Sequence, residues 1–377
     1  MDGTYNVRAG PGTSYARAGQ VRAGQTLDIL ARNRDGTWWQ VCCVDGEEVW
    51  IKADLAPTQG PTGAVAVAAD IPPTPTPAPP TAAPTAAPTV VEGVPAELPG
   101  KIAFPVFDPG RRTYNLYVAS PDGSDIEQVL DEASQPALSP DGQHIAFRHW
   151  WNGGRGIAVM NTYGGDLRKF SNFHEDALPS WSPDGKALVF FSRRESDRKS
   201  RIYQVWLADR TEWEMARGGE PVYGEYPTWM ADGSIVYRAT WPEMGIAVMK
   251  TDGSGDRLLF SDESATAPAA SPDGAYITFM SLHEGNWEIY RINTDGSGLL
   301  RLTDNEANDG LPAWSPDGNT IAFVSDRDGA WGMWAMTADG QGHTRLFELP
   351  GSPNGLIPDE PDYTTKGWLE ERISWSP

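Results

Sequence analysis

A four-residue motif that recurs at nearly constant spacing constrains the fold of residues 100–377 more than any other feature. Ser-Pro-Asp-Gly begins at Ser139, Ser182, Ser271 and Ser315, and the variant Met-Ala-Asp-Gly begins at Met230. The successive spacings are 43, 48, 41 and 44 residues. Proline followed by Asp-Gly is typical of a tight turn between two strands. A period of this length predicts one four-stranded sheet, or blade, of a β-propeller for each repeat.

The two ends of the repeat region set the number of blades. We label the strands of one repeat a to d in chain order, with the Ser-Pro-Asp-Gly turn between a and b. Residues 101–104 match strand b without a preceding strand a, and residues 373–377 match strand a without a following strand b. One blade built from both ends pairs these strands and removes two exposed sheet edges. The sequence therefore predicts six blades, closed by a strand that places Trp375 beside Ile102.

These repeats resemble the TolB-like propeller repeats, over nearly all of residues 100–377. TolB is a periplasmic protein that binds other envelope proteins. Related propellers occur as substrate gates of serine peptidases, as sugar-polymer lyases and as interaction platforms. The resemblance implies an all-β fold, and it leaves these functions open because the repeat motif is architectural.

Residues 4–55 resemble a bacterial Src homology three domain, a small β-barrel. The residues that carry the resemblance are the run from Asn6 to Thr13 and the pair Trp38-Trp39. The resemblance implies that cell-wall peptides or short protein segments bind in an aromatic groove. We expect contacts from Tyr15, Trp38 and Trp50 there; the alternative is that Trp39 and Trp50 are core, since a small barrel needs large side chains to bury enough area. This family usually opens with a further strand, and little sequence precedes Tyr5, so we also expect the module to be truncated or its first strand to come from elsewhere.

Composition predicts a linker between the two modules. Residues 61–99 contain 11 Pro, 10 Ala and 6 Thr, which cannot build a hydrophobic core and favour extended polyproline II. The predicted domains are therefore residues 1–60, a linker over 61–99, and a propeller over 100–377.

Charge and hydropathy exclude several classes of partner. The formal net charge is −21, which argues against nucleic acid or an anionic membrane as a general partner. No apolar run approaches the 18 residues of a membrane span, and residues 1–10 carry no apolar secretory core. The family resemblance nevertheless implies a location that is extracellular, at the cell surface or periplasmic.

No residue pattern in the chain indicates catalysis or a cofactor. Gly-x-Ser-x-Gly and His-Glu-x-x-His are absent from the sequence. We expect no metal; the alternatives are a site of His149, His174 and His283, or calcium in the loop at Asp326. The adjacent cysteines, Cys42 and Cys43, are predicted to be unpaired strand residues.

Loop chemistry favours one face of the propeller as a binding surface. In a blade the b–c and d–a loops share one face, and in this chain they are long and rich in Trp and Arg, which dominate binding hot spots. The predicted partner contacts are Arg148, Trp151, Arg194, Arg238, Trp241, Trp287, Arg327, His174, Glu225 and Trp368. The alternative is that the tryptophans pack between blades and the arginines pair locally. Residues 348–372, an unusually long d–a connection, are expected to bind a partner or to plug the axial channel.

Three functions follow from these features. The first is a non-enzymatic envelope or extracellular binding protein, whose small module binds wall peptide or a protein segment and whose propeller binds a protein. The second is a structural subunit of a surface assembly, forming homo-oligomers by strand exchange at the small module. The third is a lyase or hydrolase that acts on a polymer at the channel mouth.

Overall fold

A computed structural model gives the fold of the chain as two compact units, Met1–Thr89 and Val90–Pro377, which are described separately. The residues that the structure describes are 5–12, 17–22, 24–44, 46–53, 58–59, 62–69, 93–95, 97–151, 155–171, 173–357 and 367–377. Among these residues no helix is long and apolar enough to cross a membrane.

The N-terminal unit is a five-stranded antiparallel sheet in the order β2-β1-β5-β4-β3. Its strands are β1 (Tyr5–Arg8), β2 (Arg17–Val21), β3 (Asp28–Arg32), β4 (Trp38–Val44) and β5 (Glu47–Lys52). The sheet buries Val7, Trp39, Val41 and Ile51 in one cluster. Tyr5–Arg8 pairs with β2 and β5 within this sheet, and a further strand supplied from elsewhere stays a prediction.

Two further local features of this unit differ from expectation. Cys42 and Cys43 are joined by a disulfide across a cis peptide bond, whereas the sequence predicted unpaired residues. Residues 62–69, placed in the linker by their composition, run along β3. They contain η2 (Thr62–Ala64), and the Arg32 backbone N–H donates to Ala66 O at 3.0 Å. Val65 packs against the core of the module. Most of the rest of the predicted linker lies outside the described residues.

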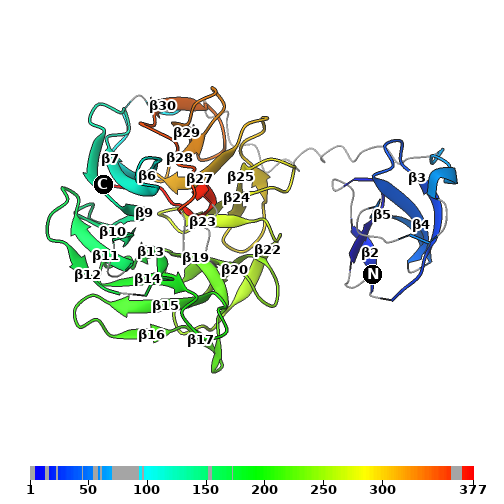
Figure 1. The fold of residues 1–377 in the computed structure, drawn as a ribbon, viewed down its shortest axis with the longest axis horizontal. Helices are drawn as coiled ribbons and strands as arrows, with labels where there is room; N and C mark the ends of the chain where they lie inside the picture. Colours follow the sequence, from blue (N-terminus) through cyan, green and yellow to red (C-terminus); the bar gives the residue numbers. More distant parts are fainter. Residues whose placement is uncertain are drawn as a thin grey trace, which may run out of the picture. The chain divides into compact units, whose positions relative to one another are not determined.

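The second unit contains six four-stranded antiparallel sheets, as predicted. Figure 1 shows them arranged around a common centre, with strand a of each blade innermost. Blade 1 combines β31 (Ser374–Ser376), β6 (Lys101–Asp108), β7 (Thr113–Ala119) and β8 (Glu127–Leu130). Blade 2 consists of β9 (Ala133–Leu138), β10 (His144–His149), β11 (Gly156–Asn161) and β12 (Arg168–Lys169). Blade 3 consists of β13 (Ala177–Trp181), β14 (Ala187–Ser192), β15 (Arg201–Trp206) and β16 (Glu212–Glu214).

The other three blades follow the same order along the chain. Blade 4 consists of β19 (Gly224–Trp229), β20 (Ile235–Ala239), β21 (Gly245–Met249) and β22 (Arg257–Ser261). Blade 5 consists of β23 (Thr266–Ala270), β24 (Tyr276–Ser281), β25 (Glu288–Asn293) and β26 (Leu300–Arg301). Blade 6 consists of β27 (Asp309–Trp314), β28 (Thr320–Ser325), β29 (Gly332–Thr337) and β30 (Thr344–Glu348). A small hairpin of β17 (Ala216–Arg217) and β18 (Glu220–Pro221) connects blades 3 and 4.

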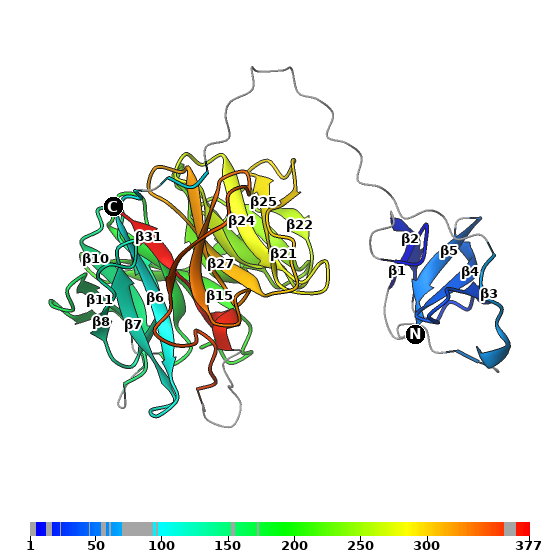
Figure 2. The same ribbon diagram turned by 90° about the horizontal axis from the view of Figure 1, so that it is seen from above.

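The ring closes through the C-terminal strand. β31 pairs with β6 in a register that places Trp375 opposite Ile102, which confirms the prediction. Figure 2 shows the two strands side by side, β31 in red and β6 in cyan. The Trp375 indole N–H also donates to Pro99 O at 2.7 Å, which fixes the beginning of the unit to the end of the chain.

The Ser-Pro-Asp-Gly motif forms the turn between strands a and b for a local reason. In the turn at Ser182, the Ser182 hydroxyl donates to Asp184 Oδ1 at 2.7 Å and accepts the Ala187 N–H at 2.9 Å. Gly185 adopts a φ of +69°, a left-handed conformation that glycine reaches without a Cβ clash. The serine, aspartate and glycine therefore each satisfy a separate requirement of the same turn.

Hydrophobic side chains fill the space between neighbouring blades. Phe147, Phe190, Phe279 and Phe323 occupy the same position of strand b in four blades, and all are fully buried. Each inner strand from β9 to β27 also contains a bulge at a residue before proline, at Gln135, Leu178, Tyr226, Ala267 and Leu311, with φ between +50° and +56°. The inner strands thus bend identically around the axis.

Candidate functional site

A plug formed by residues 367–373 closes the axis on the face of the b–c and d–a loops. It comprises η3 (Gly367–Glu370) and the three residues that follow. Trp368 is 6% exposed and lies against Trp287 and Trp331, with ring centroids 6.2 and 5.2 Å away. Gln135 Nε2 donates to Glu370 O at 2.8 Å, and the Tyr226 hydroxyl donates to Leu369 O.

With the bond from Arg372 to Pro179 of blade 3, the plug contacts all five other blades, so the end of residues 348–372 forms the expected plug. Partner binding by the rest of this connection stays a prediction. Trp368 was also predicted to contact a partner, and that expectation is wrong because its ring is buried beneath the loops of blades 5 and 6. Residues 358–366 of this connection lie outside the described residues.

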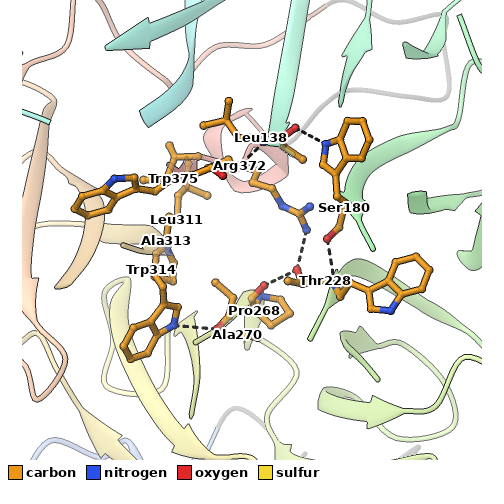
Figure 3. Close-up of a pocket in the computed structure, with 18 of the residues that line it drawn as sticks. Leu138, Ser180, Thr228, Pro268, Ala270, Leu311, Ala313, Trp314, Arg372 and Trp375 are labelled. Carbon is orange, nitrogen blue, oxygen red and sulfur yellow. Dashed lines mark hydrogen bonds between the residues drawn. The ribbon is translucent and has the colours of Figure 1, made fainter. Parts of the chain in front are cut away.

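An axial cavity of about 350 Å³ lies on the other side of the plug, and its mouth is at the face of the a–b turns. Its wall consists of the inner strands, mainly small and apolar residues such as Ala137, Ala269 and Ala313. Figure 3 shows the Trp314 and Trp375 rings directed away from the cavity and the Arg372 side chain directed into it. Sequence reasoning did not identify this cavity, because the inward-facing residues are ordinary strand residues.

Arg372 is the functional side chain that sequence reasoning missed. Its Nη1 donates to Pro179 O at 2.6 Å, and its Nη2 donates to Pro227 O at 3.0 Å and to Thr228 Oγ1 at 3.1 Å. Burial lowers its pKa to about 10, so the guanidinium remains charged at neutral pH. The only available signal was its position, since it occupies the place of the bulge residue in blade 1.

Most of the arginines that were predicted to contact a partner form ion pairs within the propeller. Glu225, 6% exposed, accepts from Arg193 and from Arg238, the latter at 3.0 Å. Burial alone would raise the Glu225 pKa, but the charges of Arg193 and Arg238 outweigh it and hold the pKa below its ordinary value. Arg327 Nη2 similarly lies 2.8 Å from Asp309 Oδ2, with its Cζ 4.6 Å from the centre of the Trp334 ring.

Two further arginines are enclosed by aromatic rings. Arg194 pairs with Glu212 and lies 3.8 Å from Asp176, and its Cζ is 3.8 Å above the Tyr203 ring. Arg148 is 8% exposed; its Cζ is 4.0 Å above Trp150, and its Nη2 donates to His174 O at 2.5 Å. Arg148, Arg194 and Glu225 are therefore buried structural groups, and the prediction that they contact a partner is wrong.

The remaining predicted residues fall into two groups. Trp241 is 61% exposed and the His174 side chain is exposed, so both are accessible on the predicted face. Trp151, Trp287, Arg238 and Arg327 are half-buried. Of the ten residues, the structure brings Glu225, Arg238 and Trp287 together around a second cavity of about 170 Å³ beside the plug.

Several loops on this same face carry an exposed apolar side chain. Besides Trp241, the loops on this side expose Phe173, Met244, Leu282 and Leu356, at 40 to 59% of their surface. The topology places all five at b–c or d–a loops. We call this group the apolar rim. Of the five, Trp241 and Met244 share one loop, and exposed apolar side chains that lie close together are typical of interaction sites.

The small module offers fewer accessible aromatic groups than predicted. Trp38 is half-buried, on the opposite face of β4 from the core residue Trp39. Trp50 is 2% exposed, so it cannot contact a peptide in an open groove, and the alternative that it is buried is confirmed. Tyr15 lies outside the described residues.

Within the described residues, no group of three or more His, Cys, Asp or Glu is placed to hold a metal ion. His149 is fully buried beside Trp151, and burial lowers its pKa to about 4. His283 lies 3.6 Å from Asp262. The three histidines considered for a metal site therefore do not converge.

Comparison with known proteins identifies both domains. Residues 237–356 match the family model of the TolB beta propeller domain, and residues 2–56 match that of the bacterial SH3 domain. The solved structure of TolB from Acinetobacter baumannii superposes with a TM-score of 0.60 at 20% identity, covering 75% of this chain and 68% of that one.

Curated relatives match parts of the propeller. The Tol-Pal system protein TolB of Francisella tularensis subsp. tularensis is 25% identical over 208 residues, which are 52% of this chain and 47% of that protein. The putative tricorn protease homolog 2 of Streptomyces coelicolor is 27% identical over 220 residues, which are 51% of this chain and 18% of that protein. The chain thus spans less than half the length of these curated relatives.

Proposed function

We propose, for a chain that joins a bacterial SH3 domain to a TolB-type β-propeller, a non-enzymatic role as a binding protein of the cell envelope or the extracellular space. The SH3 domain binds wall peptide or a protein segment, and the propeller binds a protein partner. The apolar rim carries this proposal, because it combines exposed apolar area with a rigid support of buried ion pairs.

The comparisons support this role at the level of the fold. Similarity to Tol-Pal system proteins favours an envelope location and a protein partner. Similarity to a protease homolog keeps the enzyme alternative open, although the match covers only 18% of that protein.

The geometry of the rim favours a protein partner over a polymer. Trp241 and Met244 project from the b–c loop of blade 4, and Lys199 Nζ lies 5.5 Å from the centre of the Trp241 ring. Trp is among the residue types enriched in protein-binding hot spots. On the same face the plug closes the axis, so a polymer chain cannot thread through the propeller from this side.

A capture experiment with full-length protein tests the propeller surface. Trp241→Ala combined with Met244→Ala should abolish retention of a specific envelope protein from an envelope extract. Tyr163→Ala is the matched control, because Tyr163 is 87% exposed on a turn of the opposite face. Equal retention by the rim variant and the wild-type protein would show that the rim is not the binding surface.

A sedimentation assay with purified insoluble peptidoglycan tests the SH3 domain. Trp38→Ala should reduce the bound fraction, because it removes a half-buried indole from the face of β4 opposite the core. Thr37→Ala, an exposed neighbour, should leave binding unchanged. Unaltered binding by Trp38→Ala would remove Trp38 from the proposed groove.

A further inference from the structure

Arg372 is a cation without a counter-charge in the axial cavity. Its three bonds go to neutral oxygens, those of Pro179, Pro227 and Thr228, while a guanidinium has five N–H donors. Among the described residues no carboxylate lies within ion-pair distance of it. Arg372 is half-buried and lines the cavity, so its remaining N–H donors can be completed by a ligand or by water.

Glu371, the other charged residue of the cavity wall, does not neutralise Arg372. Its Oε2 accepts the Gln135 N–H at 3.0 Å, so the carboxyl group is directed to blade 2, whereas the Arg372 guanidinium is directed to blades 3 and 4. Burial raises the pKa of Glu371 well above its ordinary value, which favours the neutral form of this group.

The backbone of the inner strands adds donors around the same cavity. Ser374 Oγ accepts the Leu138 N–H at 2.9 Å, and Ser180 Oγ accepts the Trp229 N–H at 3.1 Å. Each serine thus satisfies an N–H group of the next blade. The equivalent position is alanine in three other blades, at Ala137, Ala269 and Ala313.

These alanines leave three N–H groups without the side-chain acceptor found elsewhere in the ring. By position they are the amides of Trp181, Trp314 and Trp375, all of which line the cavity. Backbone N–H groups that face a cavity are ready donors for an anion. The wall thus combines one fixed cation, several N–H donors and small apolar side chains.

We propose that the axial cavity binds a small organic carboxylate, whose carboxylate group is held by Arg372 and whose apolar body lies against the alanine and proline residues of the wall. The volume of about 350 Å³ suits a small molecule. Guanidinium–carboxylate bonds are charge-assisted and stronger than neutral ones. The site goes beyond the proposed function, because its mouth lies on the face opposite the apolar rim.

Fluorine NMR on the full chain tests the proposal with two matched probes. The first is 4-fluorobenzoate, which carries a carboxylate on an apolar ring, and the second is the neutral 4-fluorobenzamide. The acid should shift or broaden on addition of the protein and the amide should not. Equal responses from both probes, or no response from the acid, would overturn the proposal.

Two variants locate the binding to this cavity. Arg372→Met should weaken binding of the acid by about tenfold or more, since it removes a charge-assisted bond. Arg372 also ties blades 3 and 4 to the plug, so Ala269→Ser is the second variant. It places a hydroxyl where Ser180 has one, caps the Trp314 N–H and should weaken binding with an unchanged melting temperature. Full affinity in the folded Ala269→Ser and Arg372→Met proteins would contradict the assignment.

A third pair of probes distinguishes a free acid from the end of a peptide. N-acetyl-alanyl-alanine and its C-terminal amide differ only in the carboxylate. Tighter binding of the peptide acid than of 4-fluorobenzoate would identify a chain end as the ligand, and the reverse order would identify a free small acid. Binding of the peptide amide as tight as that of the peptide acid would contradict a role for Arg372.

Discussion

Asp176 is a buried acid whose surroundings raise its pKa. Asp176 directly precedes β13, the inner strand of blade 3, and it is fully buried. Arg194 Nη1 lies 3.8 Å from Asp176 Oδ2. Burial raises its pKa from 3.8 to about 6, and the neighbouring hydroxyls of Ser171 and Ser192 and the charge of Arg194 offset only part of that rise. The folded protein therefore binds the Asp176 proton more tightly than the unfolded chain does.

This shift predicts a specific pH dependence of stability. Because the folded pKa is the higher one, the contribution of Asp176 to stability falls as pH rises through the window from about 4 to 6. Relative to Asp176→Asn, the wild-type free energy of unfolding should fall by on the order of 3 kcal/mol across that window. Urea unfolding at pH 4 and pH 7 measures the difference. Parallel changes in the two proteins would contradict the shift.

An exposed acid provides the control for that experiment. Asp304 has 84% of its side chain exposed, in a loop of blade 5. Asp304→Asn should follow the wild-type pH dependence, because exposed charges interact weakly with the rest of the protein.

Trp368 is predicted to be a major single contributor to the stability of the plug. Trp368→Ala removes a buried indole from a cluster with Trp287 and Trp331 and leaves a cavity at the axis. The expected cost is about 3–5 kcal/mol in the free energy of unfolding, measured by urea denaturation. Trp241→Ala, a similar truncation at a 61% exposed site, should cost about 0.5 kcal/mol or less. Similar losses in both variants would argue against a buried plug.

At the scale of elements, the repeated turns share one conformation but differ in what surrounds them. Gly142 and Gly274 occupy the same position of the Ser-Pro-Asp-Gly turn, with φ of +68° and +74°. A Cβ on Gly274 would meet nothing within 4 Å, whereas a Cβ on Gly142 would lie 2.0 Å from Pro377 O. The turn at Gly142 is therefore packed against the closing strand.

This pair gives a prediction that separates turn strain from closure. Gly274→Ala should cost about 1 kcal/mol, from the left-handed conformation alone. Gly142→Ala should cost clearly more, because it must also displace the end of β31. Thermal unfolding of the two variants side by side measures the difference. Equal melting temperatures would mean that Pro377 does not lie against this turn.

The elements were largely predictable from sequence, because each depends on neighbours along the chain. The turn at Ser182 is specified by three residues within four positions, and the strands that follow it are apolar runs of ordinary length. The pairing of β31 with β6 was predictable for another reason. The repeat at each end of the propeller region lacks one strand, and each end supplies the strand that the other lacks.

The site was far less predictable, because it depends on pairs that only the fold brings together. Arg193 and Glu225 are 32 positions apart and come from different blades. The sequence therefore cannot show that Glu225 forms ion pairs with two arginines. Arg372 and Pro179 are 193 positions apart. The sequence does not show whether the side chain of a loop arginine faces solvent, an acidic side chain or the propeller axis.

At the scale of the whole propeller, the two faces differ because only one is closed. The plug blocks the axis on the face of the apolar rim, and the cavity opens on the face of the a–b turns. Both arrangements require the last strand to be in place, since η3 and Arg372 precede β31 directly. The proposed partner binding at the rim and the proposed carboxylate binding in the cavity therefore both depend on ring closure.

A disulfide cross-link across the closing pair tests that claim most directly. Ala103 and Ser374 are opposite each other in the β31–β6 register, and paired antiparallel residues lie at a separation that a disulfide can span. In the variant Ala103→Cys with Ser374→Cys, mild oxidation should form a disulfide between positions 103 and 374, detected as a cross-linked peptide, and should raise the melting temperature. Ala103→Cys alone should do neither. Absence of the 103–374 link in folded, oxidised protein would contradict a propeller closed by its C-terminal strand.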